Sequence, residues 1–170
     1  MITANEAIAR LKAGNQRFMS GVRSIETDVK STNRAGFVGG QAPFAIVLGC
    51  SDSRVPAEII FDQGLGDLFV IRVAGNIVAP SQVGSVEFAA EQFGTPLVVV
   101  LGHSQCGAVT ATLNELKNPS QATSSTNVMS IVNRIRPSIQ PLFDAGLHQD
   151  SEQLLAACIH ANMLAATSHL

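Results

Sequence analysis

The sequence predicts an α/β fold: an open sheet with a parallel core of at least three strands, helices on both faces and a helical arm at the N-terminus. Three short runs rich in Val, Ile and Leu are each typical of a strand buried on both faces. Segments with helical periodicity separate these runs, and such alternation favours parallel strands joined by right-handed crossovers. A length of 170 residues suits one compact domain, so we expect a single domain over 1–170.

The N-terminal arm is predicted to be an amphipathic helix, because Thr3 and Glu6 have the spacing of a capping box ahead of it. The three strands are expected at FAIVLG from Phe44, LFVIRVA from Leu68 and LVVVLG from Leu97. A short helix is expected at AEIIFDQ, between the first two strands. A longer one is expected at PSQVGSVEFAAEQFG, between the last two.

The C-terminal third is predicted to be helical. Apolar residues recur at helical spacing from Val128, and Pro137 is expected to end or kink this helix. The final stretch, SEQLLAACIHANMLAATSHL, predicts another helix. Cys158 lies within it, and we expect it to be an ordinary packed side chain.

The composition excludes several classes of protein. Lys and Arg number 11 against 13 Asp and Glu, without blocks of like charge, so no nucleic-acid or anionic-membrane partner is expected. No apolar run reaches the length of a membrane span, and the start lacks the pattern of a signal peptide. Three cysteines without a CxxC pair are a poor disulfide framework. We therefore expect a cytoplasmic protein with reduced thiols and a small-molecule partner.

Chemistry-bearing side chains follow two of the three predicted strands. Cys50 comes directly after the first, and His103 and Cys106 follow the third in GHSQCG. Ligands in open α/β sheets gather at the carboxyl ends of the strands, so these residues can meet. Two thiolates and an imidazole suit Zn²⁺ and leave its fourth position free, as in a catalytic site. A lone buried cysteine or histidine is more often structural, but two such clusters after strands favour zinc.

Asp52 and Arg54 follow Cys50 in GCSDSRVPAE and allow two interpretations. They can form a surface ion pair, worth about 0.5 kcal/mol. Alternatively, Arg54 holds the Asp52 carboxylate away from the metal, so that Asp52 accepts a hydrogen bond from zinc-bound hydroxide.

The motifs CSDSRV and HSQCGAV, about fifty residues apart, resemble those of β-class carbonic anhydrases, as do VIRVAGNIV and GSVEFAAEQFGTPLVVVLGH. The resemblance implies that Cys50, His103 and Cys106 bind one Zn²⁺ per chain and that Asp52 and Arg54 form the catalytic dyad. It also implies the reaction, which is reversible hydration of CO₂ to bicarbonate and a proton by zinc-bound hydroxide.

The resemblance further implies a substrate pocket and an assembly. Phe69, Ala74 and Phe88 match the apolar wall that holds CO₂, although Phe69 and Phe88 equally suit an ordinary core. The Gln41 amide and the Gly107 N–H match groups that contact the substrate. Because pockets of the family cross a dimer interface, a homodimer or a higher homo-oligomer is expected.

The chain also departs from the family's usual pattern. The C-terminal strand of most members is expected to be missing, and Phe88 replaces a common tyrosine. Val47 stands where a tryptophan completes the regulatory bicarbonate pocket of one subclass, so the chain resembles the subclass without it. We therefore expect a resting site open to water near neutral pH.

Two alternative functions remain, a same-fold CS₂ or COS hydrolase and a catalytically inactive zinc-binding module.

Overall fold

The structure, a computed structural model, describes residues 2–25, 27, 38–119, 125–146 and 150–170. The chain divides into two compact units, which are described separately below. Unit 1 comprises Met1–Leu48, Ser53–Ile71 and Pro80–Val99; unit 2 comprises Gly49–Asp52, Arg72–Ala79 and Val100–Leu170. A single domain over 1–170 stays a prediction.

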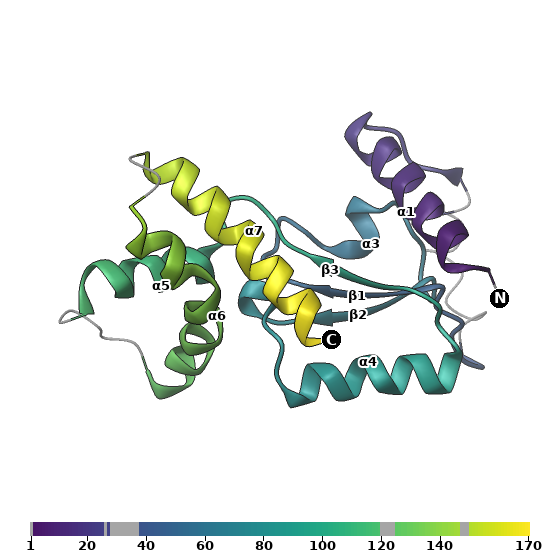
Figure 1. Cartoon of the computed structure of the whole chain (residues 1–170). Coiled ribbons are helices and arrows are strands. Elements are labelled where there is room, and N and C mark those ends of the chain that lie inside the picture. Colours follow the sequence, from purple (N-terminus) through teal and green to yellow (C-terminus); the bar gives the residue numbers. More distant parts are fainter. Residues whose placement is uncertain (1, 26, 28–37, 120–124, 147–149) are drawn as a thin grey trace. The chain divides into compact units, whose positions relative to one another are not determined.

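The described helices and strands alternate as the α/β prediction requires (Figure 1). In chain order they are α1 (Ala4–Met19), β1 (Ala45–Gly49), α3 (Ala57–Ile60), β2 (Leu68–Arg72), the 3₁₀ turn η2 (Ala74–Asn76), α4 (Pro80–Phe93), β3 (Val98–Leu101), α5 (Gly107–Lys117), α6 (Thr126–Asp144) and α7 (Ser151–His169). The three strands run parallel in the order β2-β1-β3, so the predicted parallel core is confirmed.

The strands differ in burial, and here the sequence prediction was partly wrong. All five residues of β1 are buried, as predicted. In β2 only Leu68 and Ile71 are buried, and in β3 no residue is. Because β1 is the central strand of the described sheet, a neighbouring strand lies along each of its two edges, whereas β2 and β3 each have a neighbouring strand along one edge only. Apolar composition alone does not reveal which strand is central.

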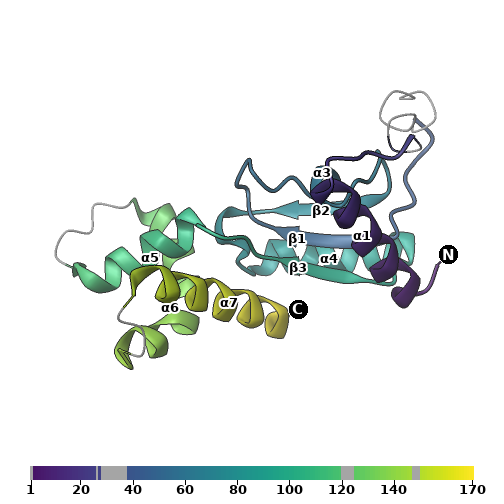
Figure 2. The ribbon, with the colours of Figure 1, turned by 90° about the horizontal axis from the view of Figure 1, so that it is seen from above.

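In unit 1, helices cover both faces of the sheet. Figures 1 and 2 show α4 along one face and α1 with α3 on the other. The predicted capping box of α1 is confirmed, because the Thr3 hydroxyl accepts from the Glu6 N–H and the Glu6 carboxylate accepts from the Thr3 N–H.

On the buried side of α1, Gly14 lies so close to the chain after α3 that an added Cβ would be 1.7 Å from the Phe61 carbonyl oxygen. Glycine is thus required for this close approach.

In unit 2, α5, α6 and α7 pack against one another and against η2. Their core contains Val109 from α5, Ile135 and Ile139 from α6, and Leu154 and Cys158 from α7. The packing of Cys158 at 0% exposure agrees with its predicted structural role.

Pro137 does not end α6, which continues to Asp144 through a second proline, Pro141. Of the two outcomes expected at Pro137, an end or a kink of the helix, the end was therefore wrong. Buried side chains on both sides of Pro137, at Ile135 and Ile139, anchor the helix to the unit 2 core, and this packing outweighs the proline's local cost.

Among the residues that the structure describes, no helix is both long and apolar enough to cross a bilayer.

Candidate metal centre

The ends of β1 and β3 bring three potential ligands together in unit 2. Cys50 comes directly after the last residue of β1. His103 is the second residue after β3, and Cys106 is the N-cap of α5. One ligand atom from each of the three side chains lies within 4.8 Å of the other two. Both cysteines are buried, and the His103 side chain is 5% exposed. The expected convergence at the carboxyl ends of the strands is therefore present.

The His103 ring is oriented for metal binding. Its Nδ1 lies 2.8 Å from the Ser104 carbonyl oxygen, and because a carbonyl only accepts, Nδ1 carries the proton and donates it. The neutral ring then has a lone pair on Nε2. That atom is buried and without a hydrogen-bond partner among the described residues. A buried nitrogen in this state is costly unless something coordinates it.

The two sulfurs influence each other strongly. The pKa of the Cys50 thiol is lowered to about 4, chiefly by a hydrogen bond from Cys106 and, against the opposing effect of burial, by the N–H of Gly75. The pKa of Cys106 is raised, because it donates that hydrogen bond and is buried beside the developing charge. The pair thus retains one proton and one negative charge. A bound dication would allow both cysteines to lose their protons, because it stabilises both thiolates.

Two groups that the sequence analysis missed support the loop after β1. Arg72, at the end of β2, donates from Nε to the Cys50 carbonyl (2.9 Å) and from a terminal nitrogen to the Asp52 carbonyl (2.6 Å). The Gly75 N–H donates to the Cys50 sulfur at 3.3 Å. The motif VIRVAGNIV contains both residues, but its residue types alone do not reveal these contacts.

The predicted dyad residues lie next to this centre in the sequence. Asp52 is half-buried, and its Oδ2 lies 3.9 Å from His103 Nε2. Arg54 is exposed and belongs to unit 1, whereas Asp52 belongs to unit 2. The pairing of Asp52 with Arg54 stays a prediction.

The predicted substrate residues are divided between the units. Ala74 and Gly107 lie in unit 2, in η2 and at the start of α5. Gln41, Phe69 and Phe88 lie in unit 1. There the Phe69 and Phe88 ring centroids lie 6.3 Å apart with the rings tilted by 40°, in a cluster with Phe93, and Phe88 is 51% exposed. Their role in a common pocket stays a prediction.

The donor set fits Zn²⁺ by its chemistry. Two sulfurs and one imidazole nitrogen are ligands that zinc prefers, and three protein ligands are the usual number in catalytic zinc sites. The unpartnered Nε2 of His103 and the charged thiol pair are the two features that a bound dication would satisfy.

Comparisons with known proteins agree with this chemistry. The family model described as carbonic anhydrase matches residues 45–170. Carbonic anhydrase 2 of Mycobacterium tuberculosis is 46% identical over 76% of this chain, which spans 61% of that relative's length. The carbonic anhydrase of Mycolicibacterium smegmatis is 46% identical over 84% of this chain and 68% of its own length.

Solved structures show the same fold. The β-carbonic anhydrase CcaA has a TM-score of 0.71 and 27% identity, over 96% of this chain and 73% of its own. A structure from a report on two tetrameric β-carbonic anhydrases of Sordaria macrospora has a TM-score of 0.67 and 26% identity, over 83% of this chain and 73% of its own.

Proposed function

The chain belongs to the β-class carbonic anhydrases, and from this premise we propose that it is a zinc enzyme that hydrates CO₂ reversibly to bicarbonate and a proton. The observation that carries the proposal is the buried, unpartnered Nε2 of His103 beside the sulfurs of Cys50 and Cys106. These three residues would hold the ion. A bound Zn²⁺ would supply a Lewis acid that makes a nucleophilic water available near neutral pH.

The surrounding residues would orient the reacting groups. The Ser104 carbonyl fixes the His103 tautomer, and the guanidinium of Arg72 holds the backbone on which Cys50 and Asp52 lie. The Asp52 carboxylate, near His103 Nε2, would accept a hydrogen bond from the attacking water and so direct its lone pair. Arg54 would keep that carboxylate from binding the metal itself.

Substrate binding is assigned from the family pattern. CO₂ is uncharged, so an apolar wall of Phe69, Ala74 and Phe88 would hold it without ordering water. The Gln41 amide would donate to a substrate oxygen. The Gly107 N–H would do the same, because it lies in the first turn of α5, where backbone N–H groups have no partner within the helix.

The deciding measurement is proton release on mixing with CO₂, followed with a pH indicator in a stopped-flow instrument. The zinc-loaded chain should release protons well above the uncatalysed rate. Hydrogen sulfide release from CS₂ or COS, without CO₂ hydration, would instead support the hydrolase alternative, which the named relatives do not favour. Zinc content without any turnover would mean a non-catalytic zinc module.

The dyad predicts the effect of Arg54→Ala. Without the guanidinium, the proposed restraint on the Asp52 carboxylate is lost and it can approach the metal, so activity should fall about 10- to 100-fold while zinc content is unchanged. Arg134→Ala, which removes an exposed arginine bound to Ser130 on α6, is the control for lost charge. The binding of thiocyanate to the cobalt-substituted protein reports whether the metal is accessible. If thiocyanate binds the Arg54→Ala variant as tightly as wild type, Arg54 does not keep Asp52 away from the metal.

We propose in addition that the chain assembles into at least a homodimer and is cytoplasmic. The tetrameric Sordaria macrospora enzymes support assembly, as do exposed apolar side chains of α1 such as Phe18 and Met19. Two reduced cysteines as ligands favour a reducing compartment. If light scattering on the purified protein gives the mass of a single chain, the proposed assembly is contradicted. Fractionation of cells tests the cytoplasmic location.

A further inference from the structure

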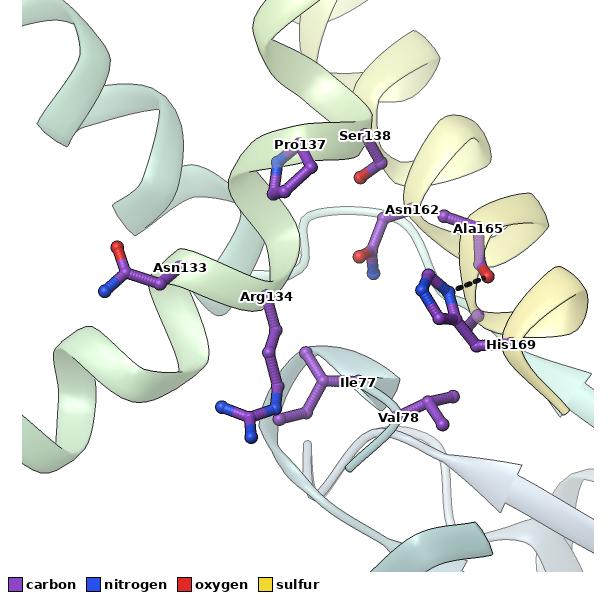
Figure 3. A pocket seen from close by; sticks show the side chains of 10 residues that line it. Ile77, Val78, Asn133, Arg134, Pro137, Ser138, Asn162, Ala165 and His169 are labelled. Atoms are coloured by element: carbon purple, nitrogen blue, oxygen red, sulfur yellow. Dashed lines mark hydrogen bonds between the residues drawn. The ribbon is translucent and has the colours of Figure 1, made fainter. Parts of the chain in front are cut away.

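Asn162 is a polar residue on an otherwise apolar face of α7. The buried positions of this helix follow one another at intervals of four residues: Leu154, Cys158, Asn162 and Ala166. Asn162 is only 4% exposed, so its amide has left water and needs partners within the protein. Figure 3 shows its side chain projecting from α7 beside a pocket of about 410 Å³ between α6 and α7.

The partner of Asn162 is the turn that supports the first metal ligand. Its Nδ2 donates to the Gly75 carbonyl at 2.8 Å, across 87 residues of sequence. The Gly75 N–H in turn donates to the Cys50 sulfur at 3.3 Å. One residue thus links α7 to a ligand of the proposed zinc site, and both hydrogen bonds lie within unit 2.

Gly75 has little freedom in this arrangement. Its φ of +71° is in the left-handed region, which glycine adopts without strain. An added Cβ would lie 2.8 Å from Ile135 of α6 and 3.0 Å from Ala108 of α5, so those helices already close two sides of the turn. The Asn162 hydrogen bond fixes the Gly75–Asn76 peptide from α7, and Gly75 Cα joins that peptide to the one whose N–H faces Cys50.

We propose that Asn162 is a positioning residue of the metal centre: it holds Gly75 so that the Gly75 N–H points at the Cys50 sulfur. This inference rests on the zinc site proposed above. An N–H directed at a thiolate stabilises its charge and its orientation, and groups of this kind around metal ligands contribute tenfold to hundredfold to metal affinity. In this role Asn162 would act through Gly75, to whose carbonyl it donates, and not on the metal directly.

The test replaces Asn162 with a side chain of similar size that cannot donate. Asn162→Leu should raise the zinc dissociation constant about 10- to 100-fold, measured by competition with a chromophoric chelator. In the cobalt-substituted protein, the thiolate-to-metal absorption band should shift or weaken, because the Cys50 sulfur has lost its hydrogen bond. Neither readout depends on turnover. Asn162→Ala, which introduces no bulk, gives the same comparison if the leucine variant does not fold.

The matched control is Cys158→Ala, one turn earlier on the same buried face of α7 and in the same core. It should lower stability but leave zinc affinity and the cobalt band as in wild type. The inference is overturned if a folded Asn162 variant keeps the zinc affinity and the cobalt band of wild type. It is also overturned if Cys158→Ala changes the zinc affinity and the cobalt band as much as the Asn162 variant does, because the role of Asn162 would then be structural. Wild-type protein that binds neither metal would instead overturn the zinc site, and with it the inference.

Discussion

Cys50→Ser should yield a folded chain that contains almost no zinc and hydrates CO₂ no faster than the uncatalysed reaction. The serine hydroxyl does not ionise near neutral pH, so the substitution removes one of the two proposed thiolate ligands and with it half of their negative charge. It also leaves the Gly75 N–H without the sulfur to which it donates. Metal analysis of the purified variant and the stopped-flow assay measure the two losses.

The third cysteine provides the control. Cys158→Ser should retain one zinc per chain and wild-type activity, because Cys158 is buried in the α7 core and is absent from the ligand cluster that the described residues form. Full zinc occupancy in Cys50→Ser would contradict the proposed centre. Loss of zinc from folded Cys158→Ser would show that a ligand has been misassigned.

Gly14→Ala should destabilise unit 1 by about 1–3 kcal/mol. An alanine Cβ would stand 1.7 Å from the Phe61 carbonyl oxygen and 2.7 Å from its carbon, which are backbone atoms and cannot rotate away. Helix α1 must therefore move. Such a shift would also disturb the hydrogen bonds from Asn15 to the Ile60 carbonyl and from Arg17 to the buried Asp62 carboxylate. Urea denaturation followed by circular dichroism measures the loss.

Gly84→Ala is the opposite case and a direct comparison. Gly84 also lies inside a helix, α4, but apart from the backbone of that helix no atom of the described residues lies within 4 Å of an added Cβ there. Alanine should therefore stabilise the chain by about 0.5–1 kcal/mol through helix propensity alone. If the two substitutions change stability in the same direction, the close approach at Gly14 does not control the packing of α1.

The convergence of the three candidate metal ligands could be predicted from the sequence because their positions follow from a general property of parallel sheets. Side chains placed just after strands meet at one edge, and a strand is recognisable from a short apolar run. Cys50, His103 and Cys106 fulfil both conditions, and the structure brings them together. The N-cap of α1 was predictable for a similar reason, since a capping box is a local pattern.

Features that depend on distant packing could not be predicted in this way. Nothing local distinguishes Asn162 from an exposed asparagine, and only the position of α7 brings it to Gly75. The continuation of α6 past Pro137 depends on the core that buries Ile135 and Ile139. The lower burial of β2 and β3 follows from strand order, which short apolar runs do not encode.

The aromatic cluster of unit 1 determines how unfolding of this chain can be observed. The sequence contains no tryptophan and no tyrosine, so its ultraviolet emission comes from phenylalanine alone. Phe88 is half-exposed on α4 and meets the Phe93 ring edge-on at 5.9 Å, so it can accept a larger ring. A Phe88→Trp chain would carry one indole fluorophore in unit 1, while cobalt absorption would report from unit 2. Coincident denaturation curves would mean that both units unfold cooperatively, and separate curves would give each unit its own stability.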